Sequence, residues 1–368
     1  MPISGYTKCM KLPKLDYTPL SKSPASQSST IWTPYLIIAA IAVIGFSIGV
    51  TAAHKQFLLV IPVALALLTL FLWLMQQREQ RQQALQAFAK ANDLTLVENV
   101  AEPAYAGQIF QQGTKREITA ALTIPAGVKS VEVGNYRYVT SSGRTSQSHH
   151  FGYVHFKLPR RLPHMLLDGT KNNNGLFSNL PDYFDKQQTL SLEGNFDKNF
   201  TLYVPQKYER DALYVFTPDV MQVLIDQASD YDIEIIDDDL FIYSSQLFDL
   251  NDVATWRKLL LVVSNLSPEL EAQTDYYADE RVVDRQLNQI TEPGRRLKKG
   301  VNWVGFLIFM AFIGFNGFTT FGDSLPEGVL PIAIAAFIVI VLALAAGQVV
   351  YSRRRHQWPL NRLVLTFH

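Results

Sequence analysis

Four long apolar stretches constrain the fold of this chain more than any other feature of its sequence. Each is between 19 and 23 residues long, and a helix that rises about 1.5 Å per residue then covers the roughly 30 Å of a hydrocarbon core. Because backbone groups in lipid must be hydrogen-bonded internally, each stretch predicts a transmembrane helix. The stretches form two close pairs, at 31–53 with 57–75 and at 301–321 with 329–350. The sequence therefore predicts two transmembrane helical hairpins.

Basic residues predict how these hairpins are oriented. Lysines and arginines lie before the first and third stretches and after the second and fourth, whereas the two short loops within the pairs carry one lysine, Lys55. Basic residues concentrate on the cytoplasmic side of a membrane. We therefore predict that a disordered tail (1–30), the long region 76–300 and a second tail (351–368) are all cytoplasmic. A secretory signal cleaved near Ala53 fits less well, because the first stretch is longer than the apolar core of a signal.

The region between the hairpins, residues 76–300, has the pattern of a folded domain. Its first half contains short alternating runs typical of strands, and its second half has apolar residues at helical spacing. The predicted fold class is therefore an α+β cytosolic domain flanked by four transmembrane helices. The predicted strands are 94–100, 109–110, 117–124, 129–140, 151–158, 189–193, 200–204 and 212–216, with a hairpin at 232–243.

Helices in this region are predicted from their starts and apolar faces. A polar helix over 76–90 follows the second span, and its Leu85 and Phe88 can dock on the domain. The TPD sequence at 217–219 combines a capping hydroxyl, a proline and a carboxylate in the first turn, which predicts a helix start. The SPE sequence at 267–269 predicts a second start of the same kind, with a long polar helix behind it.

Two runs in the middle of the chain resemble a known family. ALYVFTPDVMQVLID and the acidic run DIEIIDDDLFIYS that follows are similar to the domain of unknown function numbered 3137 of uncharacterised bacterial membrane proteins. The upstream runs GNYRYVT, FKLPRRLPHMLLD and LEGNFDKNFTLYVPQKYERDA extend the resemblance to residues 130–250. The resemblance implies a multi-pass protein of the bacterial inner (plasma) membrane with a cytosolic domain. It implies no activity, and therefore no catalytic residue.

Charge and cysteine content exclude several classes of function. Region 76–300 carries 24 basic and 30 acidic residues, a net charge of −6. Nucleic-acid binding needs a basic surface, so no nucleic-acid partner is expected. Cys9 is the only cysteine, which excludes an intramolecular disulfide and a cysteine-based zinc site. No glycine-rich phosphate loop is found, and no cofactor is predicted.

The densest charged set of region 76–300 is a candidate catalytic site. Carboxylates beside an arginine perform acid–base or phosphate chemistry when they converge in a pocket. The alternative is local pairing of the arginine with a carboxylate, which would fix a loop. The residues are Asp185, Asp197, Glu209, Arg210 and Asp211.

Three histidines form a candidate metal site, since imidazoles bind transition metals. They are His149, His150 and His155, and they would meet only if their segment folded back; the alternative is a solvated loop. The acidic run 237–239 offers carboxylate oxygens to a hard cation. It lacks the spacing of a calcium-binding loop, and a turn with solvated charges is the alternative.

Basic clusters beside the last two predicted spans would attract anionic lipid head groups, at roughly 1 kcal/mol per residue. Membrane topology alone also explains these clusters. The lipid bilayer is a predicted partner, and a homo-oligomer or a protein partner is compatible with the sequence. The cluster residues are Arg295, Arg296, Lys298, Lys299, Arg353, Arg354 and Arg355.

Together these features favour an inner-membrane protein without enzymatic activity, whose cytosolic domain is a scaffold, sensing or interaction module. A membrane-tethered hydrolase that uses the charged set at 185–211 is the first alternative. A small channel or transporter is the second, but the predicted spans contain no Asp, Glu, Lys or Arg, and ion-coupled transport usually needs such groups.

Overall fold

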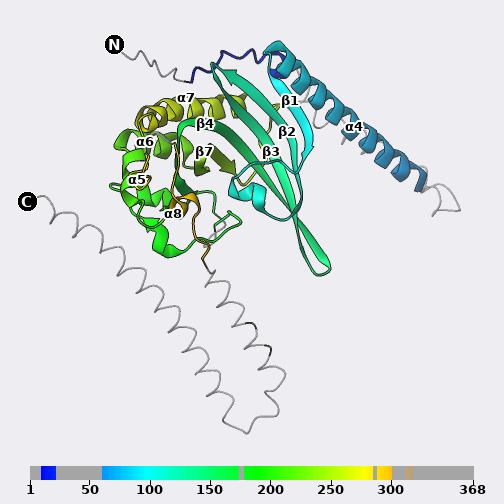
Figure 1. The fold of residues 1–368 in the computed structure, drawn as a ribbon. Coiled ribbons are helices and arrows are strands. Elements are labelled where there is room, and N and C mark those ends of the chain that lie inside the picture. The colour runs from blue at the N-terminus through cyan, green and yellow to red at the C-terminus, as the bar shows by residue number, and fades with distance from the viewer. Residues whose placement is uncertain are drawn as a thin grey trace, which may run out of the picture.

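The computed structural model describes residues 10–21, 60–173, 178–284 and 288–300, together with Phe312 and Asn316. These residues form a seven-stranded antiparallel sheet with a few helices packed on it (Figure 1). The strands are β1 (Thr95–Ala101), β2 (Thr114–Ala126), β3 (Lys129–Ser142), β4 (Thr145–Gly169), β5 (Thr189–Leu190), β6 (Phe200–Tyr203) and β7 (Asp232–Ser244). The helices are α1 (Thr18–Ser21), α4 (Val60–Ala91), α5 (Glu209–Val215), α6 (Pro218–Val223), α7 (Val253–Thr274) and α8 (Glu292–Arg295).

The sheet is organised around β4, which is 25 residues long. One edge of β4 pairs with β3 near its start and with β6 near its end, and the other edge pairs with β7. Phe156 and Leu166 each have a partner on both sides, which places β7 opposite β3 and β6. The segment 141–150 forms the outer arms of the β3–β4 hairpin, whose turn lies at Gly143 with φ 59°.

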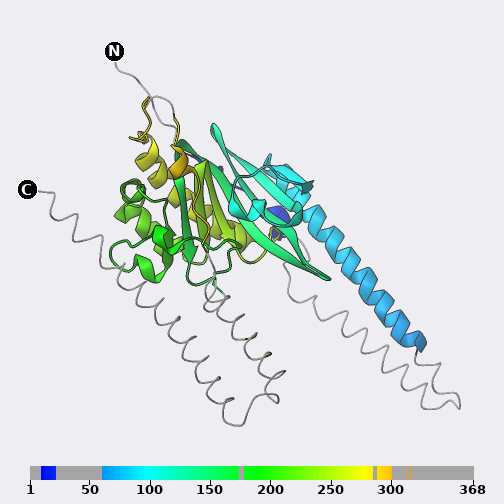
Figure 2. The ribbon, with the colours of Figure 1, turned by 60° about the horizontal axis from the view of Figure 1, so that its bottom comes forward.

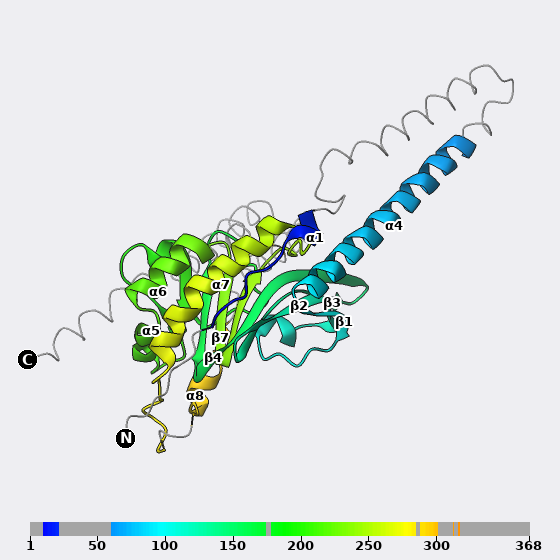
Figure 3. The same ribbon diagram turned by 90° about the horizontal axis from the view of Figure 1, so that it is seen from above.

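Both faces of the sheet are covered by apolar side chains. On one face α7 lies across the strands, with α5 and α6 beside it (Figure 3), and Trp256, Leu259 and Val263 are buried there. On the other face a short helical turn (Gln108–Gln111) inserts the buried Phe110 among aromatic rings of the strands. The sheet is therefore the middle layer of the described part of the chain.

β4 and β7 bend together near the middle of β7. Asp239 pairs with Lys157 and Asp237 with Leu162, so four residues of β4 face the single residue between these two aspartates. Extra residues on one strand bend a ladder, and Asp237 has the left-handed φ of 54° at this point. The 13 residues of β7 would span about 43 Å if straight. The ring centroids of Tyr231 and Phe248, which lie beyond its two ends, are 6.3 Å apart, so β7 curves strongly.

The C-terminal half of α4 docks on the domain as predicted, while its first half projects away from the sheet (Figures 1 and 2). Leu85 and Phe88 are buried, and the Phe88 ring lies 5.9 Å from Tyr17 and 5.3 Å from Trp256, centroid to centroid. Residues 10–21 belong to the tail predicted as disordered, yet they pack here. Apolar burial of their side chains against α4 and α7 explains the difference.

The structure contradicts the predicted membrane topology. No helix in the described ranges is long and apolar enough to span a membrane. The predicted span 57–75 overlaps α4, which turns polar after Met75 and continues to Ala91. This overturns the fold class with transmembrane hairpins, the transmembrane character and the multi-pass inner-membrane location. The predicted spans 31–53 and 329–350 and the tail 351–368 lie outside the described residues, as does 301–321 apart from two residues.

The predicted α+β class is also corrected by the sheet itself. A large antiparallel sheet dominates the described residues, and the helices packed on it are few. Four local predictions differ as well. Segment 109–110 lies in the helical turn Gln108–Gln111 instead of a strand, and segment 212–216 forms the end of helix α5 and its C-cap instead of a strand. Segment 232–243 lies in the single strand β7 instead of a hairpin, and 267–269 lies inside α7 instead of starting a helix.

Candidate functional site

The predicted charged set does not converge. Asp185 accepts a hydrogen bond from the Gln187 backbone and caps a short helical turn. Asp197 accepts hydrogen bonds from Ser191 and from the Leu192 backbone, and Glu209 accepts one from the Lys207 backbone. Arg210 is exposed and forms no ion pair within the described residues. Each of the three carboxylates is therefore bonded to the backbone within a few residues of its own position.

Asp211 belongs to a separate ion-pair cluster with Arg281. The Arg281 guanidinium lies 3.0 Å from Asp211 Oδ2 and 3.0 Å from Asp279 Oδ1, and it stacks 3.9 Å above the centre of the Tyr208 ring. Burial and the Asp279 carboxylate raise the pKa of Tyr208 to about 12, so its hydroxyl stays a donor to Asp279. This cluster also differs from the alternative interpretation, in which Arg210 would pair with a carboxylate, because the arginine that binds Asp211 is Arg281.

The three histidines lie apart along β4. His149 and His155 are separated by six residues of regular pairing with β3, which corresponds to about 20 Å. His149 is hydrogen-bonded to Thr140 and stacked on Tyr138, and burial lowers its pKa. His155 is paired with Asp239 of the acidic run, at 2.7 Å. Across the described part of the chain, no group of three or more His, Cys, Asp and Glu residues is arranged to hold a metal ion.

The clusters predicted for lipid contacts are partly used inside the fold. Arg295 is paired with Glu292 at 3.0 Å, and Lys299 with Asp182 at 2.7 Å. The residues 353–355 lie outside the described residues.

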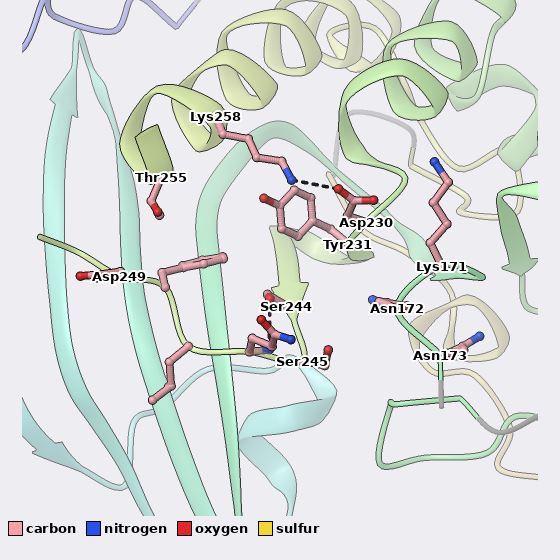
Figure 4. A pocket seen from close by; sticks show the side chains of 13 residues that line it. Lys171, Asn172, Asn173, Asp230, Tyr231, Ser244, Ser245, Asp249, Thr255 and Lys258 are labelled. Atoms are coloured by element: carbon pink, nitrogen blue, oxygen red, sulfur yellow. Dashed lines mark hydrogen bonds and ion pairs between the residues drawn. The ribbon is translucent and has the colours of Figure 1, made fainter. Parts of the chain in front are cut away.

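A cleft of about 600 Å³ opens where β7 curves back beneath the start of α7 (Figure 4). One wall is the segment after β4, another is the turn before β7, and the floor is the loop that leads from β7 to α7. Its lining is mainly polar. The lining residues are Lys171, Asn172, Asn173, Asp230, Tyr231, Ser244, Ser245, Gln246, Leu247, Phe248, Asp249, Thr255 and Lys258.

Hydrogen bonds to strands β3 and β4 hold the floor of this cleft in place. Asn135 of β3 bonds to both backbone groups of Phe248, with Nδ2 donating to the carbonyl and Oδ1 accepting from the N–H. The Gly152 N–H donates to the Gln246 carbonyl at 3.0 Å. A Cβ at Gly152 would lie 2.8 Å from the Phe248 ring and 2.9 Å from that carbonyl, so the close approach requires glycine. The floor is therefore built onto the sheet itself.

Lysines supply the cationic groups of the cleft. Lys258 lies 2.9 Å from Asp230 and 5.0 Å above the centre of the Tyr231 ring. The hydrogen bond from Lys258 lowers the pKa of Asp230. Figure 4 shows Lys258 and Lys171 on either side of Asp230. Lys171 donates to Ser229 at 2.8 Å and has no carboxylate ion-pair partner among the described residues. Asp249, also in the lining, is 3.7 Å from Arg81 of α4.

Two buried aspartates lie directly behind the cleft walls. The register that pairs Leu167 with Ile233 places Asp168 of β4 opposite Asp232 of β7. Burial raises the pKa of Asp168 to about 6. Burial and the charge of Asp168 raise the pKa of Asp232 to about 7. Each aspartate is next to one wall of the cleft in sequence. Asp168 precedes the segment that contains Lys171, and Asp232 follows Asp230 and Tyr231.

A second buried polar group on the same sheet is fully hydrogen-bonded. Glu234 accepts from the Gln108 backbone and the Tyr243 hydroxyl, and lies 2.7 Å from His164 Nε2. His164 Nδ1 accepts from the Leu297 N–H, so its Nε2 carries the proton that Glu234 accepts. The group has a structural role, since it attaches the segment around Leu297 to the sheet.

The cleft and the aspartate pair were not identified from the sequence. The available signal was a single carboxylate at the end of each apolar run, in HMLLD for Asp168 and in YDIEII for Asp232. A carboxylate in this position is equally typical of the polar end of an ordinary strand. Only the register of β4 with β7 shows that the two face each other.

Comparison with known proteins identifies no relative of this chain. The resemblance of residues 130–250 to the uncharacterised bacterial family stays a prediction. No family model, curated protein or solved structure matches the chain.

Proposed function

We propose that the described domain is a non-enzymatic sensing module that binds a small polar anion, carrying a carboxylate or phosphate group, in the cleft beneath α7. The observation that carries this proposal is the cleft of about 600 Å³ with Lys171 and Lys258 in its walls. Ligand pockets typically have volumes of about 300–1,000 Å³.

The pairing of charges in the cleft supports an anionic ligand. The lining carries two lysines, Lys171 and Lys258, and two carboxylates, Asp230 and Asp249. Asp230 is paired with Lys258, and Asp249 is paired with Arg81, which lies outside the lining. Both carboxylates already have a cationic partner, whereas Lys171 is bonded only to a hydroxyl in the described structure. An anion would add a charge-assisted hydrogen bond to Lys171, and such bonds are stronger than those between neutral groups.

The lining favours binding over catalysis. It contains no histidine or cysteine. The hydroxyl of Thr255 donates to the capping Asp252, and Ser244 Oγ accepts from the Gln246 backbone. A nucleophilic hydroxyl needs a base within hydrogen-bond reach, and both carboxylates of the lining are committed to ion pairs.

Calorimetric titration of the full-length protein tests this proposal. The probes are sulfate, which imitates a phosphate group, and succinate. At least one should bind, and K171M should weaken its binding by about tenfold or more, since hydrogen bonds to charged groups are worth about 1.5–3 kcal/mol. K186M, at an exposed lysine outside the cleft, should bind like the wild type. Absence of binding by both probes, or equal affinity in K171M and K186M, would overturn the proposal.

A further inference from the structure

We propose that anion binding in the cleft is coupled to the uptake of a proton by the Asp168–Asp232 pair, so that the domain senses its ligand and pH together. This inference rests on the proposed function and adds a regulator to the same site. The carboxyl groups of Asp168 and Asp232 lie behind the cleft and are not part of its lining.

The geometry of the pair makes a second negative charge costly. Residues directly opposite on antiparallel strands have Cβ atoms about 4.5–5.5 Å apart, and the side chains of Asp168 and Asp232 are 6% and 0% exposed. Asp232 accepts from the Gly169 N–H at 2.8 Å and from Asn179 Nδ2 at 2.7 Å. Asp168 Oδ1 is buried and has no hydrogen-bond partner among the described residues. Like charges so close in a dry site retain a proton.

The groups around the pair do not neutralise it. Tyr203 faces it from β6, and burial and the Asp168 charge raise the pKa of Tyr203 to about 12, so the phenol stays neutral. Glu234 and Tyr243 face it from β7, and Tyr243 donates its hydrogen bond to Glu234. None of these groups is a cation. The raised pKa values of both aspartates, near 6 and 7, agree with this arrangement.

The pair is connected to the cleft through both of its walls. Lys171 lies three residues after Asp168, and Asp230 lies two residues before Asp232. Gly169, whose N–H donates to Asp232, also lies against the cleft lining. A Cβ there would lie 2.8 Å from the Tyr231 carbonyl oxygen and 3.2 Å from Asn172 Oδ1, and both residues line the cleft. An anion held at Lys171 would therefore lie close to the pair and oppose its full ionisation.

Linkage makes this effect reciprocal: a ligand that favours the protonated pair binds more tightly when the pair is protonated. Affinity should therefore fall as pH rises through the range in which the pair loses its proton. We take the charge of the bound anion and the charge of the aspartate pair to be about 8 Å apart, at an effective dielectric constant between those of protein and water. Their repulsion then changes the affinity roughly fivefold.

The experiment is calorimetry on the full-length protein with the tighter-binding of sulfate and succinate. Sulfate takes up no proton over this pH range, and succinate affinities are expressed for its dianion, with its own protonation subtracted. Titrations at one pH near 7 in buffers of different ionisation enthalpy measure the number of protons taken up on binding. The wild type should take up a fraction of a proton, and its affinity should fall roughly fivefold from about pH 6 to about pH 8.

D168N and D232N are the diagnostic variants, because the amide keeps the shape and removes the titration. In each, proton uptake should drop below that of the wild type and the pH dependence should flatten, whereas D219N, at an exposed aspartate of α6, should behave like the wild type. Binding without proton uptake and with equal affinity at both pH values would overturn the coupling alone. Failure of both probes to bind at either pH would overturn the proposed function instead.

Discussion

At the scale of single residues, Asp168 and Asp232 stand out because their burial is unfavourable for the folded state. A carboxylate away from water needs hydrogen bonds or a cation to keep its charge. Asp232 has two hydrogen bonds, whereas Asp168 Oδ1 has none among the described residues. Protonation of the pair removes this cost, and the stability of the domain should then depend on pH.

The free energy of unfolding should fall as pH rises from about 4 to about 7. In this range an unfolded Asp232, with its ordinary pKa of 3.8, has lost its proton, while the folded residue, with a pKa of about 7, keeps it. One pKa unit corresponds to about 1.4 kcal/mol, so Asp232 contributes a loss of up to about 4 kcal/mol. Urea denaturation at pH 5 and pH 8 measures this change in the free energy of unfolding. D232N should lose less stability between these two pH values than the wild type or D219N. An equal loss in all three proteins would contradict the assignment.

At the scale of elements, the pattern of apolar residues was misleading where one segment fits both the strand period and the helix period. ALYVF at 212–216 alternates like a strand, but Ala212, Val215 and Phe216 are buried while Leu213 and Tyr214 are 45% and 44% exposed. That spacing is helical. The three aspartates at 237–239 look like a hairpin turn, yet Asp239 binds His155 and Asp238 binds Lys157 of β4. These cross-strand pairs keep the chain in one bulged strand.

Helix α7 shows how burial overrides a local start signal. Ser267-Pro268 has the composition of a helix start, but Leu266 and Leu270 on either side of it are buried in the same core as Trp256. The helix therefore continues through the proline, which has no N–H to donate. A polar helix was predicted to extend towards residue 291, but α7 ends at Thr274.

Docking of α4 depends on Phe88 more than on any exposed residue of that helix. Phe88 is fully buried between Tyr17 and Trp256. F88A should lower the free energy of unfolding by about 3–5 kcal/mol, the range for a buried aromatic side chain, and should release residues 10–21 together with the helix. L74A, at an exposed position of α4, should change it by less than about 0.5 kcal/mol. Urea denaturation with proteolysis of the N-terminal segment measures both, and equal effects would contradict the docking.

At the scale of the whole molecule, segments distant in sequence are held to one sheet by a few polar contacts. Glu271 of α7 joins the chain start to β3 by accepting from the Met10 N–H and from Lys129. Residues 297–300 return to the loop around residue 184. There the Lys298 N–H donates to Gln188 Oε1, and the Lys298 carbonyl accepts from Gln188 Nε2. These contacts hold the segment that begins at Met10 and residues 297–300 against the rest of the described chain.

The Arg281 cluster should control how firmly residues 275–284 and 288–300 are held. R281M keeps much of the aliphatic stem but leaves Asp211 and Asp279 without their cation. Asp279 is fully buried and Arg281 is 33% exposed, so the cost should be roughly 2 kcal/mol, below that of a fully buried pair. Hydrogen exchange should speed up selectively across residues 275–284 and 288–300. R210M, at the exposed arginine of α5, is the control, and equal exchange in both variants would contradict this role.

The sequence by itself determined the β-rich first half of the domain, the docking of α4 through Leu85 and Phe88, and the helix start at residues 217–219. Periodicity and the preference of proline for the first helical position are local properties. The predicted capping bond of the Thr217 hydroxyl does not form, and Pro218 marks the helix start. Tertiary structure alone decided the register of β4 with β7, and with it the facing aspartates and the cleft. Strand pairing joins residues more than sixty positions apart, and the bulges that bend β4 and β7 depend on cross-strand partners that no local pattern specifies.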